Sequence, residues 1–322
     1  MDAITIVGAG GIGCAVGYAF AKSGAEVTFV EADAAKVAYG MANGVAVDRR
    51  PPLSTKFVHF DHWRPTGDEI VWLCTKCYDN PAVLARLPAG VTVVPVQNGF
   101  DRQLEALGHA AEGIAAFVSE CRPHQTHTRI TRPGKLYLGF RGGPVERRMT
   151  VWADRLQKAG LFPVRLVSDI RPYKHSKLMY NAAISPLAAA AGLDNGQLLA
   201  DSLARRLFFR VLQENHAILR AAGLPLGTVG PLSPGVVAAI LRRPAVANAL
   251  AWAFYPSLRG TYCSMAGDIV KGRTEIDNYT GHLLRLAGNR PCPLNRRVYE
   301  VFKRLEHRRE VPGVAVLREL ED

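Results

Sequence analysis

A glycine-rich turn near the amino terminus restricts the fold more than any other feature of the sequence. The segment Gly8–Gly13 follows an apolar run, Ala3–Val7, and leads into a helix-like stretch over residues 12–23 that Gly24 closes. The order of strand, turn and helix is the context in which G-x-G-x-x-G carries meaning. Glycines allow a tight turn and let backbone N–H groups approach a pyrophosphate, which the helix dipole also attracts. We therefore predict a dinucleotide site formed by Gly8, Gly10, Gly11, Ile12 and Gly13; the alternative is a turn without a ligand.

Glu31 directly follows the next strand-like segment, Glu26–Val30. An acidic side chain at this place can accept hydrogen bonds from the ribose hydroxyls of NAD, and it repels the 2′-phosphate of NADP. No arginine follows it, and Lys36 is the first cation after it. The segment favours NADH over NADPH, whereas the plainer interpretation of Glu31 is a solvated charge at a strand end.

Strand-like and helix-like segments alternate in the first half of the chain, and helix-like segments alone fill the second. Further strands are predicted at 70–74, 91–96, 113–118 and 136–140. This alternation predicts an α/β domain, a Rossmann-type doubly wound parallel sheet. Long amphipathic stretches after Ser168 predict an all-α carboxyl-terminal domain. We expect domains at 1–168 and 169–322, packed so that ligands bind in a cleft between them.

Composition argues against several other classes of protein. No apolar run approaches the ~20 residues that span a bilayer, and the amino terminus lacks a basic leader, so we expect a cytoplasmic protein without membrane contact. The net charge of +12 comes from cations scattered over helices, and we expect no nucleic-acid binding. Six cysteines are spread along the chain, and the one close pair, Cys74 and Cys77, lacks the second pair that a zinc site needs. We expect reduced thiols and no metal.

Polar residues recur in short motifs along the rest of the chain. Lys76 follows a predicted strand, and Gln97-Asn98-Gly99 follows the next. Lys177 and Asn181 are four residues apart and share one face of a predicted helix. The later motifs are Ser185-Pro186-Leu187, Asn195-Gly196-Gln197-Leu198, Ser264-Met265 and Gly272-Arg273-Thr274-Glu275-Ile276-Asp277.

Taken together, these motifs resemble the 2-dehydropantoate 2-reductase (ketopantoate reductase) family, from Ile4 to about Glu306. The resemblance implies NAD(P)H-dependent reduction of 2-dehydropantoate to pantoate, a step of pantothenate and coenzyme A synthesis, with NADPH as the usual cofactor. It implies catalytic roles for Lys177 and Glu275, and contacts of Lys76 and Asn98 with the nicotinamide side. The substrate residues that it implies are Asn98, Asn181, Ser185, Asn195 and Ser264.

The chemistry of ketone reduction explains why a lysine is a suitable candidate. Hydride delivery to the carbonyl carbon leaves negative charge on oxygen, which a cation or acid must meet. A lysine with an ordinary pKa of ~10.4 is protonated and can donate. We interpret Lys177 as the proton donor and Glu275 as the residue that positions it. His175, close by in sequence, is expected to be an exposed helix histidine.

Three departures from the family pattern keep other functions open. Ser185 replaces a second asparagine, the stretch 119–127 is unusual, and Glu31 replaces an arginine-type reader of NADPH. One alternative is a reductase on the same scaffold for another 2-keto acid or an imino acid. Another is a nicotinamide-binding redox sensor without turnover. The oligomeric state is left open, with a homodimer among the options.

Overall fold

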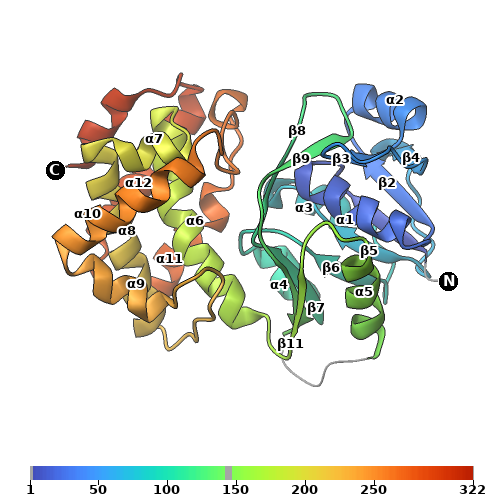
Figure 1. The fold of residues 1–322 in the computed structure, drawn as a ribbon, viewed down its shortest axis with the longest axis horizontal. Coiled ribbons are helices and arrows are strands. Elements are labelled where there is room, and N and C mark those ends of the chain that lie inside the picture. The colour runs from blue at the N-terminus through green and yellow to red at the C-terminus, as the bar shows by residue number, and fades with distance from the viewer. Residues whose placement is uncertain (1–2, 142–146, 322) are drawn as a thin grey trace. The chain divides into compact units, whose positions relative to one another are not determined.

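The protein is described by a computed structural model that covers residues 3–141 and 147–321. The chain separates into two compact units (Figure 1). The first consists of Met1–Gln97 with Asp101–Ile170, and the second consists of Asn98–Phe100 with Arg171–Asp322. A three-residue segment between two elements of the first unit thus belongs to the second.

A five-stranded parallel sheet forms the centre of the first unit. Its order is β4 (Lys56–His59), β2 (Val27–Glu31), β1 (Ile4–Val7), β5 (Ile70–Leu73) and β6 (Thr92–Pro95). Every neighbouring pair is parallel. The central strand β1 is fully buried, as expected where helices cover both faces of a sheet.

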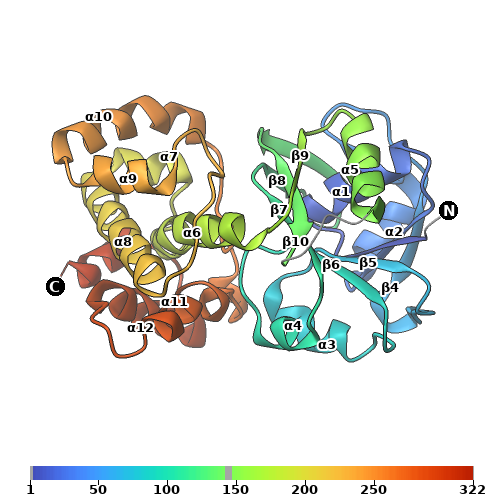
Figure 2. The same cartoon turned by 90° about the horizontal axis from the view of Figure 1, so that it is seen from below.

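Helices of the first unit lie on both faces of this sheet. They are α1 (Gly11–Lys22), α2 (Ala34–Asn43), α3 (Asn80–Leu84), α4 (Arg102–Leu107) and α5 (Arg147–Lys158). Figure 2 shows α1 and α5 on one face and α3 and α4 on the other. The predicted Rossmann-type α/β sheet is confirmed, and α1 matches its predicted bounds to within one residue.

The later strands do not extend the parallel sheet, contrary to the expectation for 113–118 and 136–140. The strands β7 (Ala111–Ala115), β10 (Leu136–Phe140) and β11 (Val164–Val167) form a separate sheet, in which β10 is antiparallel to β7. A third sheet contains β3 (Ala46–Val47) and the hairpin of β8 (Val118–Cys121) and β9 (His127–Arg132). A single strand over 113–118 is wrong because the strand is interrupted at Ala116 and Phe117, between β7 and β8. A Cβ on Gly134 would lie 2.4 Å from the Ala116 oxygen, so only glycine allows this approach.

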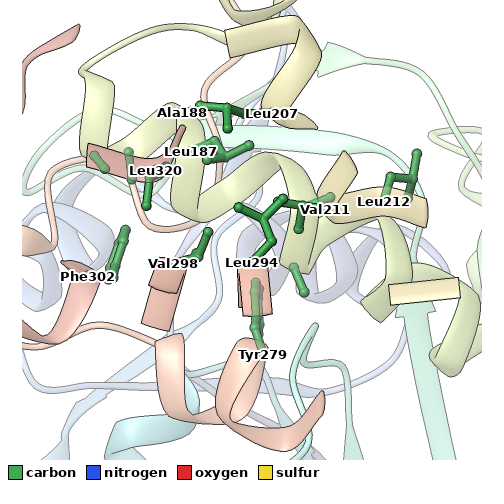
Figure 3. Packing of buried hydrophobic residues seen from close by; sticks show 14 of the residues in the cluster. Leu187, Ala188, Leu207, Val211, Leu212, Tyr279, Leu294, Val298, Phe302 and Leu320 are labelled. Atoms are coloured by element: carbon green, nitrogen blue, oxygen red, sulfur yellow. The ribbon is translucent and has the colours of Figure 1, made fainter. Parts of the chain in front are cut away.

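The second unit is helical, which confirms the prediction for the carboxyl-terminal half. Its helices are α6 (Arg171–Ala191), α7 (Asn195–Ala200), α8 (Ser202–Ala221), α9 (Pro234–Leu241), α10 (Pro244–Phe254), α11 (Thr280–Ala287) and α12 (Pro293–Arg308). Short 3₁₀ helices lie at Tyr255–Leu258, Ile269–Lys271, Ile276–Asn278 and Val314–Leu320. Leucine, valine and aromatic side chains of α6, α8 and α12 pack into one core (Figure 3).

A buried polar network fixes α6 against its neighbours. Asn215 of α8 donates its side-chain N–H to the Met179 oxygen of α6 at 3.0 Å. Asn295 of α12 donates to the Asn215 side-chain oxygen at 2.9 Å, and Glu214 accepts the Asn295 backbone N–H at 2.7 Å. Because buried polar groups are costly when unpaired, this network favours one position of α6 in the helical core.

Among the described residues, no single helix is long and apolar enough to cross a membrane. The pair Pro234–Leu241 and Pro244–Leu258 reaches that threshold only by combined length and composition, and it is bent by 119°.

Candidate active site

Each glycine of the first turn has a different structural role. A Cβ on Gly13 would lie 1.9 Å from the Gly8 oxygen, so Gly13 allows α1 to pack closely on the turn. Gly8 has φ +98°, a left-handed conformation that glycine adopts without strain. A Cβ on Gly10, by contrast, would have no atom within 4 Å. The open space beside Gly10 therefore fits a ligand, and Gly10, at the N-cap of α1, has no side chain that could cap the helix.

The hairpin of β8 and β9 lies against this turn, which the sequence did not predict. A Cβ on Gly11 would lie 2.3 Å from the Ser119 oxygen. The Ser119 hydroxyl is buried, and it has no hydrogen-bond partner among the described residues. A buried unpaired hydroxyl beside a helix amino terminus fits a site for a phosphate oxygen. The only signal in the sequence was the unusual composition of 119–127.

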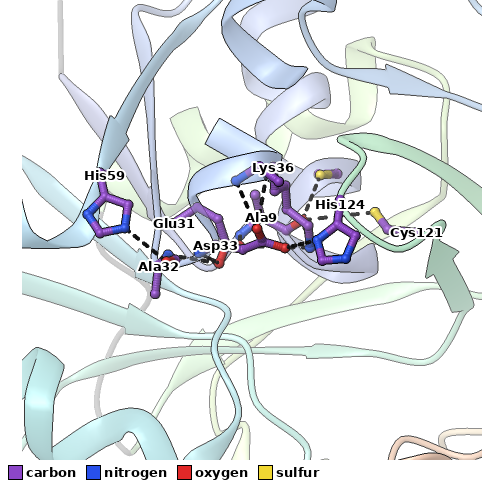
Figure 4. Close-up of polar contacts among 10 residues, drawn as sticks. Ala9, Glu31, Ala32, Asp33, Lys36, His59, Cys121 and His124 are labelled. Atoms are coloured by element: carbon purple, nitrogen blue, oxygen red, sulfur yellow. Dashed lines mark hydrogen bonds and ion pairs between the residues drawn. The ribbon is translucent and has the colours of Figure 1, made fainter. Parts of the chain in front are cut away.

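Glu31 is not a solvated charge at a strand end. Its carboxylate accepts the backbone N–H groups of Ala9 at 3.0 Å, Ala32 at 2.8 Å and Asp33 at 3.1 Å (Figure 4). Lys36 lies 3.9 Å away, and the Glu31 side chain is only 15% exposed. The acid is therefore held in one orientation at the end of β2, next to the glycine turn.

Asp33 connects the start of α2 with the hairpin loop. Its carboxylate caps α2 by accepting the N–H groups of Ala35 and Lys36, and it contacts the His124 ring at 2.6 Å. Burial alone would raise the pKa of Asp33, but His124 and the capping N–H groups hold that pKa below its usual value. The hairpin loop is thus tied to the region around Glu31.

The segments that follow β5 and β6 are joined by Gln97. Its side-chain N–H group donates to the Thr75 oxygen at 2.8 Å and to the Asn80 side-chain oxygen at 2.7 Å. Lys76 precedes a 3₁₀ helix, Cys77–Asp79, at the same edge of the sheet. The structure therefore brings Lys76 and the glycine turn to the carboxyl ends of adjacent parallel strands, where doubly wound sheets bind ligands.

Asn98 belongs to the helical unit, although the sequence placed it with Lys76. Asn278 fixes this segment, because the Phe100 N–H donates to the Asn278 oxygen and the Asn278 side-chain N–H donates to the Phe100 oxygen, both at 3.1 Å. Gly99 allows the close approach, since a Cβ there would lie 2.8 Å from the Asn278 Cβ. Asn98 is consequently in the same unit as the residues of α6.

Two imidazole rings and one lysine ammonium group lie against the Phe100 ring. It stacks on His175 with centroids 5.4 Å apart and on His282 at 4.3 Å, and the Lys174 Nζ lies 4.5 Å from its centroid. The expectation of an exposed His175 is wrong, because its side chain faces Phe100 and the residue is only 7% exposed. Lys174 is buried as well, and its ammonium over the ring stabilises this arrangement.

Lys177, Asn181 and Ser185 lie at four-residue intervals on α6, which is helical from Arg171 to Ala191. Lys177 and Asn181 are half-buried, and Ser185 is buried. The Ser185 backbone oxygen accepts a hydrogen bond from the Cys263 thiol at 3.4 Å. The predicted common helix face of Lys177 and Asn181 is therefore present.

Glu275 and Ser264 occupy loops that are firmly attached to the helical core. Glu275 is only 3% exposed and immediately precedes the 3₁₀ helix Ile276–Asn278. Its neighbour Thr274 donates its N–H and hydroxyl to Glu306 of α12, at 2.6 and 2.7 Å. The Ser264 hydroxyl is hydrogen-bonded to the Tyr279 hydroxyl at 2.9 Å.

Asn195 is the first residue of α7, and one end of its side-chain amide is used in a structural hydrogen bond. Its side-chain N–H donates to the Thr261 hydroxyl at 3.2 Å, and its backbone N–H donates to the Thr261 oxygen at 2.9 Å. Its side-chain oxygen is buried without a hydrogen-bond partner among the described residues. That oxygen is the part of Asn195 that fits a ligand hydroxyl.

Cys74 and Cys77 are separate free thiols in this structure. All six cysteines are free, and burial raises the pKa of Cys74 to about 12. Over residues 3–141 and 147–321, no group of three or more histidine, cysteine or acidic side chains could hold a metal ion.

These features define a class of protein. A parallel sheet with an open glycine turn and an acid after its second strand, followed in the chain by a helical domain, characterises nicotinamide-dependent oxidoreductases of two domains. The particular family follows from sequence comparison. The chain belongs to the ketopantoate reductase PanE/ApbA family, whose amino-terminal model matches residues 4–142 and whose carboxyl-terminal model matches residues 169–306. Members of this family are NAD(P)-dependent reductases of 2-keto acids.

Individual relatives are distant. The chain is 28% identical to 2-dehydropantoate 2-reductase of Pyrobaculum aerophilum over 243 residues, covering 73% of this chain and 76% of the relative. A PanE/ApbA family ketopantoate reductase from Ralstonia eutropha JMP134 has a similar structure, with TM-score 0.76, 23% identity and coverage of 95% and 99%. D-mandelate dehydrogenase bound to NADH and anilino(oxo)acetate has TM-score 0.77, 19% identity and coverage of 96% and 100%. The structural likenesses show the fold alone.

Proposed function

We propose that this protein reduces 2-dehydropantoate to pantoate with NADH or NADPH, and so acts in pantothenate and coenzyme A synthesis. The observation that carries the proposal is the face of α6 on which Lys177 and Asn181 lie four residues apart. A cation and an amide on one rigid helix can meet the carbonyl and a second polar group of a small 2-keto acid.

Lys177 is the proton donor in this proposal. Its ammonium meets the negative charge that develops on the carbonyl oxygen, and it donates a proton to that oxygen. Glu275 accepts a hydrogen bond from Lys177 and orients it. The buried position of Glu275 and the attachment of Thr274 to Glu306 support this role, because a fixed acid can hold the lysine in one orientation.

The remaining polar residues bind the substrate. Asn98, Asn181, Asn195 and Ser264 hold its carboxylate and hydroxyl groups. The attachment of Asn98 to the helical unit through Asn278 supports this assignment, because Asn98 then belongs to the same unit as Lys177. The unpaired side-chain oxygen of Asn195 supports a contact with a donor group.

The cofactor is held by the first unit. The glycine turn and the amino terminus of α1 bind the pyrophosphate, and Lys76 lies at the nicotinamide side. The bound nicotinamide supplies the hydride. Glu31 favours NADH, because an oriented carboxylate at the end of β2 accepts from ribose hydroxyls and repels a 2′-phosphate.

A second candidate is a reductase of another 2-keto acid or of an imino acid. Ser185 favours it, since a buried serine is smaller than the amide that the family pattern has at this place. A shorter side chain leaves room for a different substituent on the substrate. The NADH-bound D-mandelate dehydrogenase, which shares the fold, illustrates that the scaffold serves other 2-hydroxy acids.

The test is the absorbance of NADH and NADPH on mixing with 2-dehydropantoate and then with a panel of aliphatic and aromatic 2-keto acids. Oxidation with 2-dehydropantoate supports the first candidate, and oxidation only with another acid supports the second. No oxidation of either cofactor with any acid, together with tight NADH binding, would favour the redox sensor without turnover.

The lysine is tested separately by Lys177→Ala, with the exposed Lys158 changed to alanine as the matched control. We expect Lys177→Ala to lower kcat by about 10² to 10⁴ while leaving NADH affinity unchanged. Lys158→Ala should behave as the wild type. Retained activity in Lys177→Ala would exclude Lys177 as the proton donor.

A further inference from the structure

Two thiols from different elements meet at one carbonyl of the glycine turn. Cys14, in the first turn of α1, donates its thiol to the Ala9 oxygen at 3.2 Å. Cys121, at the end of β8, donates to the same oxygen at 3.9 Å (Figure 4). With one proton each, the two thiols can share a hydrogen bond only when one of them turns from the Ala9 oxygen to the other sulfur. Because both sulfur atoms approach the same oxygen, at 3.2 and 3.9 Å, rotation of the two side chains can bring them together to form a bond.

The two thiols differ in acidity and in exposure. The hydrogen bond with Cys121, followed by burial, raises the pKa of Cys14 well above its ordinary value. The hydrogen bond with Cys14, helped by Thr128 and opposed by burial, lowers the pKa of Cys121. Cys121 is also partly exposed, whereas Cys14 is fully buried. An accessible, more acidic thiol beside a second, protected thiol is the arrangement of redox-sensitive pairs.

We propose that Cys14 and Cys121 form a reversible disulfide under hydrogen peroxide, and that this bond weakens dinucleotide binding at the glycine turn. The Cys121 thiolate attacks one peroxide oxygen, which gives a sulfenic acid and, after protonation, water. The Cys14 sulfur then attacks the Cys121 sulfur, and the hydroxyl group leaves as a second water. The two thiols together lose two electrons and two protons, and one peroxide is reduced to two waters.

The contacts of Ala9 explain how this bond reaches the nucleotide site. The Ala9 oxygen also accepts from Lys36 at 3.4 Å, and the Ala9 N–H donates to Glu31. Disulfide formation removes both thiol donors from the Ala9 oxygen, so Ala9, whose N–H group orients Glu31, loses two contacts on its other side. A change at the two sulfur atoms is therefore transmitted to the acid that would meet the adenosine ribose.

The hairpin provides a second route to the same effect. A disulfide brings its sulfur atoms to ~2.05 Å, closer than any hydrogen-bonded pair of thiols. Cys121 is thereby drawn towards α1, together with Ser119 two residues earlier. The Ser119 oxygen already lies only 2.3 Å from the place of a Cβ on Gly11, so the turn has little room on this side. Pulling the hairpin inwards narrows the space in which the pyrophosphate would bind.

The first measurement is the mass of the whole protein before and after hydrogen peroxide, followed by a non-reducing digest. We expect the loss of two hydrogen atoms and a peptide that links Cys14 to Cys121, both reversed by dithiothreitol. NADH binding, measured by calorimetry on the reduced and oxidised protein, should weaken by about tenfold, which corresponds to ~1.4 kcal/mol.

Three serine variants complete the design. Cys14→Ser and Cys121→Ser should bind NADH as the reduced wild type does and should not respond to peroxide. Cys292→Ser, a buried cysteine of the helical unit, should keep the full response. Thermal unfolding of each variant shows whether it is folded.

The possible failures can be separated. A link between other cysteines, no link at all, or a Cys14–Cys121 link with unchanged NADH affinity would overturn the proposal. The effect on affinity rests on the proposed cofactor site. If the reduced wild type binds neither NADH nor NADPH, the cofactor assignment fails together with that effect, whereas the mass measurement still decides whether the disulfide forms.

Discussion

Asn278 pairs with both polar groups of the Phe100 backbone, as acceptor for its N–H and as donor to its carbonyl oxygen. The two residues are far apart in sequence, and their contact holds residues 98–100 in the helical unit. The segment that carries Asn98 is therefore held by both the backbone oxygen and the side chain of Asn278, three residues after Glu275.

Asn278→Ala should impair catalysis without changing cofactor binding. Losing the side-chain hydrogen bond frees the Phe100 carbonyl and loosens Asn98, and a small misplacement of a substrate contact can lower kcat by about tenfold or more. The loss of stability should be about 1 kcal/mol. Steady-state kinetics with the preferred 2-keto acid, together with calorimetric NADH binding, measure both effects.

The matched control for this change is Asn43→Ala, because the Asn43 side chain makes a similar hydrogen bond to a backbone oxygen at an exposed site of α2. It should leave kcat unchanged. Equal kcat values for Asn278→Ala and the wild type would show that the anchor of Phe100 has no part in positioning Asn98.

Two glycines of the first turn should respond oppositely to alanine. Gly13→Ala places a methyl group 1.9 Å from the Gly8 oxygen, so we expect it to destabilise the protein by ~2 kcal/mol or more. The Cβ that Gly10→Ala adds has no atom within 4 Å, so this change should leave the melting temperature nearly unchanged. Because the methyl group would occupy space kept for the pyrophosphate, Gly10→Ala should nevertheless weaken NADH binding. Unaltered NADH affinity in a folded Gly10→Ala protein would argue against a ligand at this turn.

The sequence was most informative where a local pattern has one physical solution. The strand, glycine turn and helix around Gly8–Gly13 could be predicted because a tight turn with close backbone approach requires glycine. The separate sheet containing β7 and β10 could not, because apolar periodicity marks a strand without telling which partner it pairs with. The break between β7 and β8 at Ala116 is packed against Gly134, which is distant in sequence.

Burial and tertiary contacts limited the predictions for the site. His175 was expected to be exposed because histidines on helices usually are, yet it packs on Phe100, a residue of a different segment. The contact of the hairpin with the glycine turn was also missed, since nothing in the local sequence of Ser119 points to Gly11. Single-residue patterns carry no information on such pairings.

Glu31→Ala should change the choice of cofactor. Removing the carboxylate takes away the acceptor for ribose hydroxyls and the repulsion of a 2′-phosphate, so the ratio of kcat/KM for NADPH to that for NADH should rise by about tenfold. Asp33→Ala is the nearby control, since it removes an acid that caps α2 rather than one that contacts Ala9. A constant ratio in Glu31→Ala would mean that the carboxylate serves only to hold the N–H groups of Ala9, Ala32 and Asp33.

Thr274→Val should show how the loop of Glu275 depends on α12. Valine keeps the shape of threonine but removes the hydroxyl that donates to Glu306, leaving a buried carboxylate with one contact fewer. We expect a loss of stability of about 1.5 to 3 kcal/mol, as for other hydrogen bonds to charged groups, and a lower kcat because Glu275 is the next residue. Thr274→Ser keeps the hydroxyl and should restore kcat more fully than stability, since it still lacks a buried methyl group. If valine and serine at 274 give the same kcat, the bond to Glu306 contributes to folding alone, and the orientation of Glu275 must come from its other contacts.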